Sequence, residues 1–420
     1  MDHSPAVEPL TPHQRRLFVF LGVATFFEGW DYFAITQILP NLRAQWGLSE
    51  SQGTLMIATL SLGSLLAFVL VRRADVVGRR PVMAMTILGY TVASLASAAA
   101  PGPVSFTLCQ LVARYFLAAE WSLAMVYAAE EFPARRRGLV IGLIQAFASL
   151  GAIMCSGLAP VLLHSSLSWR GLYIVGAAPL VLMMVLRRAL PETRRFAAIA
   201  ETTRRTPSLW HIWHTPHRRR VVQLATIWGL TYACTNNALT FWKDFAVHER
   251  GLSDGKVGQV LTIAAIASLP LVFGAGKLID VVGRRGGAVV IYLMTAISVF
   301  CVYTLHNMIA LTVFLTFSIV AVNAVLPLLT SYTSELFPTE LRSDAYAWAN
   351  NLLGRITFVL SPLAIGIIAD DDAFGTGHGL GQGFGVAVSS TVVFVIVALV
   401  LILRWLPETK NRELEDTSVL

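Results

Sequence analysis

Long apolar runs alternate with short polar segments along the whole chain. About 20 helical residues are needed to cross the roughly 30 Å of hydrocarbon in a bilayer. Backbone groups inside a bilayer must be hydrogen-bonded within their own segment, so we expect each run of this length to be a helix. The twelve predicted spans are residues 17–38, 54–73, 82–101, 105–131, 138–163, 168–187, 221–244, 257–279, 287–305, 308–334, 343–369 and 384–404. The pattern therefore predicts an all-α membrane protein with twelve transmembrane helices.

The predicted spans form two sets of six on either side of a charged stretch. The hexapeptide DVVGRR occurs at Asp75–Arg80 and again at Asp280–Arg285. The two copies are 205 positions apart, and the same shift relates Glu130 to Glu335 and Arg137 to Arg342. Two such pseudo-repeats in an apolar chain are typical of secondary transporters. The expected parts are an N-terminal six-helix bundle at 1–187, a cytoplasmic linker at 188–220 and a C-terminal six-helix bundle at 221–420.

Composition agrees with a membrane environment. The chain is 55% hydrophobic and 14% charged, and its mean hydropathy is +0.64. Soluble domains carry about 25% charged residues. The four cysteines lie in apolar runs, so we expect reduced packing residues rather than a disulfide framework. The chain has no Walker loop, no HExxH and no G-x-S-x-G, so the sequence indicates neither an enzyme nor an ATP-driven pump, and we expect no cofactor.

Arginine is concentrated in one set of loops: before the first span, after the second, fourth and eighth spans, and in the central stretch. Loops rich in basic residues face the cytoplasm, so both termini are expected on that side. The net charge of +7 reflects this bias and does not indicate nucleic-acid binding, because anionic lipid headgroups meet these loops. We therefore expect a multi-pass protein of a cell inner membrane, and a monomer.

Three histidines in the central stretch could be mistaken for a metal site. His211, His214 and His217 are spaced by three, which on a helix would place them on one face. A proline interrupts that helix, and Trp210 and Trp213 favour an amphipathic segment on the membrane surface. The sequence therefore predicts an interfacial linker and no metal site.

The second copy of the repeat reads GKLIDVVGRR at Gly276–Arg285 and fits the pattern G-x-L-x-D-x-x-G-R-R in full. By this motif the chain resembles the major facilitator superfamily. The glycine permits close helix approach, and the aspartate can pair with arginines at a helix end, which implies a latch that closes in only one conformation. The first copy departs from the pattern at Val71 and Arg73. The expected cytoplasmic gate residues are Asp75, Gly78, Arg79, Arg80, Glu130, Arg137, Gly276, Asp280, Gly283, Arg284, Arg285, Glu335 and Arg342.

Other motifs resemble the sugar-porter and metabolite–proton symporter branch of that family. The segment 332–342, YTSELFPTELR, is similar to the tenth-span signature of sugar porters, and PET at 191–193 and 407–409 is similar to motifs after the sixth and twelfth spans. Glu120 and Trp121 resemble the G-E-W of metabolite–proton symporters. Two sugar-binding patterns of the branch are missing from the seventh and tenth spans, so a sugar substrate is less favoured.

Five ionisable residues fall inside predicted spans, where each costs about 2.5–3.5 kcal/mol and is therefore expected to be paired and functional. They are Glu28, Asp31, Arg114, Glu120 and Arg355. At 1.5 Å per residue the first three lie at one level, roughly 11–15 Å below the outer end. The resemblance implies that Asp31 carries the proton, that Arg114 tunes it, and that Glu28 and Glu120 belong to the same coupling group. The alternative is a static buried salt bridge that fixes helix packing.

Arg355 is the strongest sequence indication of the substrate. It lies near the bilayer midplane, and the C-terminal half offers it no acid at that level. A guanidinium favours a carboxylate, whereas a neutral sugar or polyol and an organic cation remain the alternatives. The other candidate substrate-binding residues are Asn350, Asn351, Asn236, Trp30 and Gln145.

The sequence thus predicts proton-coupled symport of a small metabolite, most favourably a carboxylate, by alternating access of the two halves. Proton-coupled efflux of hydrophobic or cationic compounds is a second hypothesis. A non-transporting membrane sensor with the same fold is a third, against which the retained intramembrane acids argue. The expected partners are a small-molecule substrate, protons and the lipid bilayer.

Overall fold

The computed structural model describes residues 11–132, 134–177, 209–338 and 341–409, and the described residues form helices joined by short turns, without strands. Nine of the described helical segments are long and apolar enough to cross a membrane. Large apolar side chains stay exposed on their outer faces, as for Leu88 (50%), Ile297 (57%) and Val400 (54%). Contiguous exposed apolar surface of this kind needs an apolar environment, which agrees with a multi-pass membrane protein.

Five long helices make up the described part of the N-terminal half. They are α1 (Pro12–Trp46), α2 (Glu50–Val77), α3 (Arg79–Ala98), α4 (Pro103–Glu131) and α5 (Ala134–Leu163). They coincide with the first five predicted spans. Each begins a few residues earlier than predicted, α1 and α2 also end later, α4 and α5 end as predicted, and α3 ends earlier than predicted. The sixth predicted span, 168–187, is described only as far as residue 177.

The C-terminal half contains more interruptions than the sequence predicts. Its elements are α8 (Arg218–Thr240), α9 (Trp242–His248), α10 (Asp254–Val282), α11 (Arg284–Thr304), α12 (Met308–Glu335), α13 (Arg342–Tyr346), α14 (Thr357–Ala369), α15 (Gly383–Ser390) and α16 (Val392–Trp405). The twelfth predicted span is broken at Thr391, whose hydroxyl donates to the Val388 carbonyl oxygen. Thr240 similarly donates to the Asn236 carbonyl oxygen just before the break between α8 and α9. Such side-chain hydrogen bonds compete with the helical ladder.

Local sequence explains where the helices begin and turn. Thr11 caps α1 in a capping box with Gln14, and Ser49 caps α2 in the same way with Gln52. The turns α2–α3 and α10–α11 pass through Gly78 (φ +115°) and Gly283 (φ +93°), a backbone region that favours glycine. The two copies of the hexapeptide therefore fold into the same turn.

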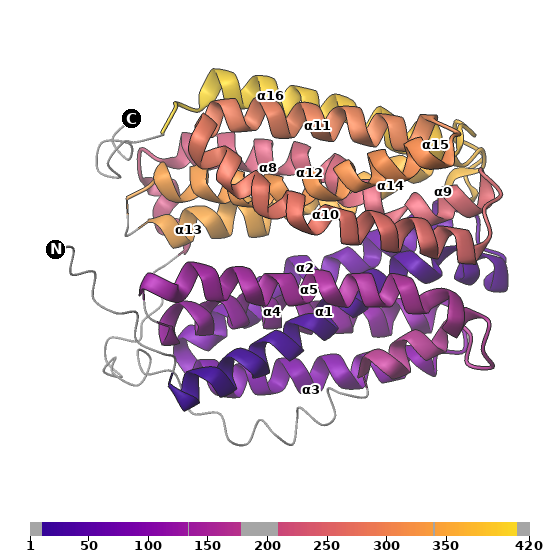
Figure 1. Cartoon of the computed structure of the whole chain (residues 1–420), viewed down its shortest axis with the longest axis horizontal. Helices are drawn as coiled ribbons and strands as arrows, with labels where there is room; N and C mark the ends of the chain where they lie inside the picture. The colour runs from indigo at the N-terminus through magenta and orange to yellow at the C-terminus, as the bar shows by residue number, and fades with distance from the viewer. Residues whose placement is uncertain (1–10, 133, 178–208, 339–340, 410–420) are drawn as a thin grey trace.

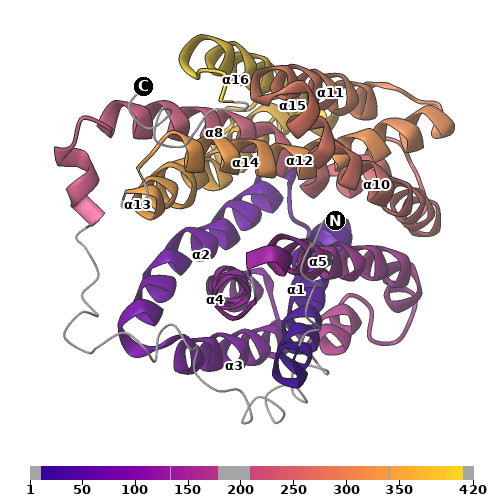
Figure 2. The ribbon, with the colours of Figure 1, turned by 60° about the vertical axis from the view of Figure 1, so that its left-hand side comes forward.

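The two halves lie side by side, with α1–α5 in one layer and α8–α16 in the other (Figure 1). We call the end that holds the α2–α3 and α10–α11 turns, with Arg79, Arg80, Arg284 and Arg285, the arginine-rich end, and the opposite end the far end. Helix α2 packs against α14 and α5 against α10 (Figure 2), and α1 packs against α9. A Cβ on Gly366 of α14 would lie 2.2 Å from Thr54 Oγ1 of α2, so the halves approach closely near the far end.

The predicted linker, 188–220, lies largely in residues 178–208, outside the described part of the chain, and the domain boundaries stay predictions. From Leu209 to His214 the chain forms a 3-10 helix, η3. Trp210 and Trp213 both pack against the Trp348 ring, each at 5.1 Å between ring centroids. Trp213 is partly buried in this contact, whereas Trp210 stays 63% exposed, so the segment is amphipathic.

Candidate functional site

The acidic segment of α1 is held in place by direct backbone packing on α5. A Cβ on Gly29 would lie 2.0 Å from the Ala148 carbonyl oxygen, and a Cβ on Gly151 would lie 1.8 Å from the Phe26 carbonyl oxygen. Only glycine fits at both positions, so the two helices touch on either side of Glu28. The carboxylates of Glu28 and Asp31 therefore project from a rigid part of the helix.

Asp31 is almost completely buried, with 1% exposure. Its Oδ1 accepts a hydrogen bond from Ser94 Oγ of α3 at 3.0 Å, whereas its Oδ2 accepts none. The Tyr90 hydroxyl, one turn away on α3, is directed to the Phe27 carbonyl oxygen at 3.5 Å and also interacts with the Asp31 carboxylate. A buried carboxyl group with an unused oxygen can take up a proton without disturbing its existing hydrogen bond.

Arg114 lies beside this acid on α4. It interacts electrostatically with Asp31, but its hydrogen bond goes from Nη2 to the Tyr32 carbonyl oxygen at 3.1 Å. The guanidinium also covers the Tyr32 ring at 4.2 Å from the centroid. The structure thus brings together the predicted pair without a direct ion pair between them, because a backbone carbonyl and an aromatic ring occupy the guanidinium. Close approach of α2 at Gly63 fixes the Arg114 backbone.

Glu28 interacts electrostatically with charged residues of both halves. Its carboxylate interacts with Glu120 and Arg114 of the N-terminal half and with Arg355 of the C-terminal half. Glu120 is 3% exposed, and Glu28 and Arg355 are partly exposed. The structure therefore brings four predicted charged residues and Asp31 into one group that spans the interface between the halves.

Arg355 lies where the eleventh predicted span is not α-helical. The wide π-helix η4 (Ala347–Leu353) is followed by the tight 3-10 turn η5 (Gly354–Ile356) and then by α14. The Arg355 guanidinium makes no hydrogen bond or ion pair to a described residue, and its Nε is buried. π-helical turns occur frequently at functional sites, because they re-aim side chains. Here the turn aims a cationic group at the interface between the halves.

Asn350, on the same π-helix, is 2% exposed and accepts a hydrogen bond from the Tyr232 hydroxyl at 2.7 Å. The Tyr232 ring packs on Phe358 at 4.7 Å and on Trp228 at 5.2 Å between centroids. These aromatic residues form a rigid wall behind Arg355 and Asn350. The sequence offered no specific sign of Tyr232 as part of the site.

A small cavity of about 20 Å³ lies between the halves. Tyr32, Thr36, Ser61 and Arg114 line it from the N-terminal half, and Asn236 and Thr240 line it from the C-terminal half. The Tyr32 hydroxyl donates to Asn236 Oδ1 at 3.1 Å and closes it. A water needs about 10–15 Å³, so this space holds about one water and excludes a metabolite in the present conformation.

The remaining predicted binding residues lie elsewhere. Trp30 is 1% exposed, and its Nε1 donates to the Leu172 carbonyl oxygen at 2.9 Å. It therefore packs inside the N-terminal half and does not line the cavity. Gln145 is exposed on α5, and Asn351 is partly exposed on η4. The structure gives neither a described hydrogen-bond partner.

At the arginine-rich end the second motif copy forms a latch. Arg284 Nη2 donates to Glu335 Oε1 at 2.8 Å, which joins the start of α11 to the end of α12. Glu408 accepts hydrogen bonds from the backbone N–H groups of Arg284 and Arg285 at 2.8 and 2.9 Å, and Thr409 donates to Glu335. A carboxylate at a helix N-terminus is favourable, so the PET segment caps α11.

The first copy is described less completely. Arg79 is 9% exposed and donates from Nη1 to the Ala74 carbonyl oxygen at 3.2 Å, and Arg80 is exposed. Arg342 of the second copy donates to the Phe337 carbonyl oxygen at 3.5 Å. The predicted side-chain contacts of Asp75, Glu130, Arg137 and Asp280, and the close approach at Gly276, lie outside the described side chains.

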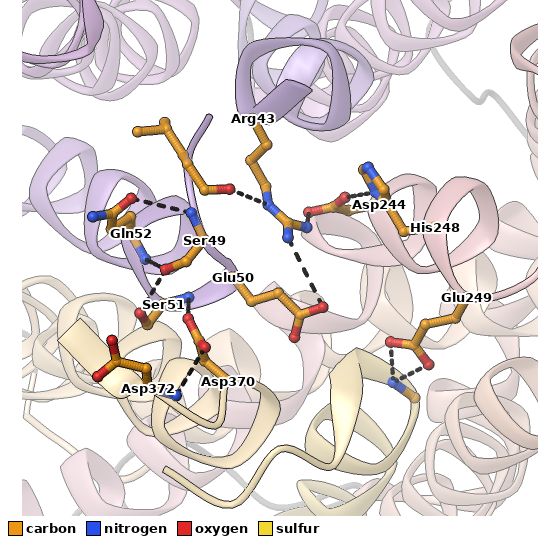
Figure 3. A network of polar contacts seen from close by, with 12 residues as sticks. Arg43, Ser49, Glu50, Ser51, Gln52, Asp244, His248, Glu249, Asp370 and Asp372 are labelled. Atoms are coloured by element: carbon orange, nitrogen blue, oxygen red, sulfur yellow. Dashed lines mark hydrogen bonds and ion pairs between the residues drawn. The ribbon is translucent and has the colours of Figure 1, made fainter. Parts of the chain in front are cut away.

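The far end holds a polar network that the sequence did not single out (Figure 3). Arg43, near the end of α1, pairs through Nη1 with Asp244 Oδ2 of α9 at 2.6 Å. Asp244 Oδ1 lies 2.5 Å from His248 Nδ1, and Glu50 lies 3.9 Å from Arg43. Asp244 is fully buried and the Arg43 side chain is 10% exposed. We call Arg43, Asp244 and His248 the far-end latch.

A second contact at the far end joins the loop after α14 to the start of α2 (Figure 3). The Ser51 N–H donates to Asp370 Oδ2 at 3.0 Å, and the Phe374 N–H donates to Ser51 Oγ at 2.9 Å. Burial alone would raise the pKa of Asp370, but hydrogen bonds from the Ser51 N–H and from the Ser49 and Ser51 hydroxyls lower it to about 2. This carboxylate is therefore ionised at any ordinary pH.

Comparison with known proteins supplies the family. A sequence model of the Major Facilitator Superfamily matches residues 21–362 and 245–418. The chain is 25% identical to the putative niacin/nicotinamide transporter NiaP of Bacillus subtilis (strain 168), over 85% of this chain and 89% of that one. It is 23% identical to the 4-hydroxybenzoate transporter PcaK of Pseudomonas aeruginosa, over 84% of this chain and 86% of that one.

Among solved structures, the fold is similar to the inward-open xylose transporter XylE of E. coli, with a TM-score of 0.76 and 17% identity, over 96% of this chain and 99% of that one. The predicted twelve-helix fold class is confirmed by this likeness and by the family match. The family consists of transporters rather than enzymes. The chain belongs to the major facilitator superfamily.

Proposed function

We propose that the protein is a proton-coupled symporter of a small carboxylate, and that it works by alternating access. The observation that carries this proposal is Arg355, a cation at the interface between the halves with no hydrogen bond or ion pair to a described residue. A guanidinium binds a carboxylate through two parallel hydrogen bonds, so the unused N–H donors of Arg355 are suited to an anionic ligand.

Two features beside Arg355 support a planar, unsaturated carboxylate. Asn350 supplies an amide on the same helix, and Tyr232 and Phe358 supply aromatic surface. The relatives named above are a putative niacin/nicotinamide transporter and a 4-hydroxybenzoate transporter. Niacin and 4-hydroxybenzoate are aromatic carboxylates, and nicotinamide is the neutral amide of the first. We therefore place the carboxylate on Arg355 and the ring toward the aromatic wall.

Asp31 and Glu28 are the proposed proton-binding residues. While Arg114 is near, it favours the ionised form of Asp31, and withdrawal of Arg114 favours proton uptake. Glu28 faces both Arg114 and Arg355, so a bound carboxylate competes with Glu28 for Arg355 and drives a proton onto Glu28. Substrate and proton would then bind together, which is the requirement for symport.

In this proposal the arginine-rich end faces the cytoplasm of a bacterial-type inner membrane and both termini lie on that side. The Tyr32–Asn236 contact and the far-end latch support a state that is closed toward the outside. A monomer suffices, because both halves of the site come from one chain.

The test is uptake into proteoliposomes with an acidic exterior. We expect nicotinate or 4-hydroxybenzoate to accumulate, xylose and an organic cation to be ignored, and collapse of the pH gradient to abolish accumulation. Arg355→Gln should abolish binding of the carboxylate, whereas Arg404→Gln, an exposed arginine on α16, should not change it. If no carboxylate binds and only cations do, efflux of cationic compounds is the better assignment. If ligands bind but are never exchanged across the membrane, a non-transporting sensor is the better assignment.

A further inference from the structure

The far-end latch puts one buried carboxylate between two cationic partners from different places in the fold. Arg43 comes from α1 in the N-terminal half, whereas His248 is four residues from Asp244 on α9 in the C-terminal half. Each partner uses a different oxygen of Asp244, at 2.6 and 2.5 Å (Figure 3). Of the two contacts, the one to Arg43 must break when the halves separate, and the one to His248 can persist.

The other charged groups near the latch are acidic or already paired. Lys243 of α9 interacts electrostatically with Asp244 and is paired with Asp254 at 2.7 Å. Glu50 of α2 lies 3.9 Å from Arg43 and interacts electrostatically with Glu249, Asp244 and Asp370. Glu249 accepts from the Gly385 N–H at 3.1 Å. The Arg43 guanidinium also rests over the Phe384 ring of α15 at 5.5 Å. The charged groups that act on His248 itself are Asp244, which holds a proton on the ring, and Arg43, which repels it.

We propose that His248 is a proton-binding site that controls the far end, and that its protonation releases Arg43 from Asp244 and opens this end of the protein. The imidazolium replaces the guanidinium as the counter-ion of the buried carboxylate. Opening then leaves no unpaired charge inside the C-terminal half. Without the imidazolium, the buried Asp244 carboxylate would lose its counter-ion, and the cost of that loss would oppose separation of the halves. This inference rests on the proposed function only in placing the far end toward the outside.

The direction follows from linkage between proton binding and conformation. The hydrogen bond to Asp244 raises the pKa of His248 above its ordinary value, while partial burial and Arg43 oppose this increase. When the latch opens, Arg43 leaves and water reaches the ring, so the open state binds the proton more tightly than the closed state. A proton that binds one state more tightly shifts the population toward it, so an acidic exterior favours opening.

The neighbouring Ser51–Asp370 contact has no such response, because its carboxylate is ionised throughout the range in which histidine titrates. A pH-dependent change at the far end that depends on His248 is therefore attributable to the latch. Histidine is suited to this role because its charge changes between about pH 5 and 8.

The experiment measures opening directly and needs no substrate, so it does not depend on the carboxylate proposal. Spin labels are placed at Leu167→Cys and Ile309→Cys, which are 45% and 77% exposed at the far end of the two halves. The partly exposed Cys109 and Cys301 are replaced by alanine. Distances between the labels are recorded in nanodiscs at about pH 5.5 and about pH 8.

We expect the longer distance to be more populated at the lower pH. His248→Gln should remove the pH response and stay closed, whereas His248→Lys should populate the longer distance at both pH values. The matched control is His164→Gln, an exposed far-end histidine bonded to the Pro160 carbonyl oxygen, which should behave like the unaltered protein. A pH response retained in His248→Gln, or closure at low pH, would overturn the proposal. If His248→Gln does not fold, the lysine variant alone decides between these outcomes.

Discussion

Arg43 and Asp244 are 201 positions apart in the chain, yet Nη1 of one lies 2.6 Å from Oδ2 of the other. Because α1 and α9 belong to different halves, this ion pair exists only while the far end is closed. Both side chains are largely removed from water, so the pair is costly to break on one side alone. Its removal should therefore change the balance between conformations more than the folding of either half.

Asp244→Asn should weaken the closed state by up to about 3–5 kcal/mol, since Arg43 loses its partner at 2.6 Å and keeps only Glu50 at 3.9 Å. Distances between the far-end spin labels would report the opening. The exposed Asp371→Asn is the control and should leave the far end closed. An unchanged distance distribution in Asp244→Asn would show that other contacts hold this end.

Asp31→Asn should abolish accumulation driven by a proton gradient and retain exchange of substrate for substrate, because the amide keeps the size of the side chain but carries no proton. The measurement compares gradient-driven uptake with counterflow in the same proteoliposomes. Equal loss of both activities would favour a static structural role for Asp31. Ser94→Ala, which removes its hydrogen bond, should alter the pH dependence of uptake and preserve counterflow.

Arg355→Lys should bind a carboxylate about tenfold more weakly than the unaltered protein, equal to about 1.4 kcal/mol. Lysine keeps the charge but loses the planar pair of donors. Ligand-induced shifts of the melting temperature measure the affinity. If lysine and glutamine variants lose affinity equally, geometry rather than charge dominates; unchanged affinity in both would exclude Arg355 from the site.

Gly151→Ala should lower stability by about 1–3 kcal/mol, because its Cβ would collide with the Phe26 carbonyl oxygen and push α1 from α5. Gly142→Ala, on the same helix with nothing within 4 Å of its Cβ, should raise stability by up to about 1 kcal/mol. Thermal unfolding in detergent compares the two variants. Equal effects at both positions would argue against the close contact.

Asp370→Asn should lower the melting temperature by the same amount from about pH 5 to pH 8. The pKa of Asp370 is depressed to about 2 in the folded protein. The stabilisation is therefore complete above the pKa that Asp370 has in the unfolded chain, and it is lost only as the pH falls toward 2. Ser51→Ala keeps the backbone donor and should have a smaller effect. A strong change in the effect between pH 5 and 8 would contradict this assignment.

Much of the fold was predictable because each span must satisfy its own backbone, which makes apolar length a direct sign of a helix. The charged group around Glu28 was predictable for the same reason, since ions inside spans are rare. The far-end latch was not predictable, because Arg43 and Asp244 occur at the ends of spans, where charged residues are expected in any case. The burial of Trp30 depends on packing against Leu172, which no local pattern records. The π-helix at Asn350 likewise has no signature in apolar spacing.

The π-helix also sets the rotational phase of the eleventh span. Each residue of an α-helix turns the chain by about 100°, and a wide turn in effect accommodates an extra residue. If all seven residues from Ala347 to Leu353 wound as regular α-helix instead, α14 would be rotated by about that angle. Ser361, which now accepts from Asn237 at 2.8 Å, would then swing away from α8. The irregular turn thus lets one helix present Arg355 to the interface and Ser361 to its neighbour, two directions that regular winding could not combine.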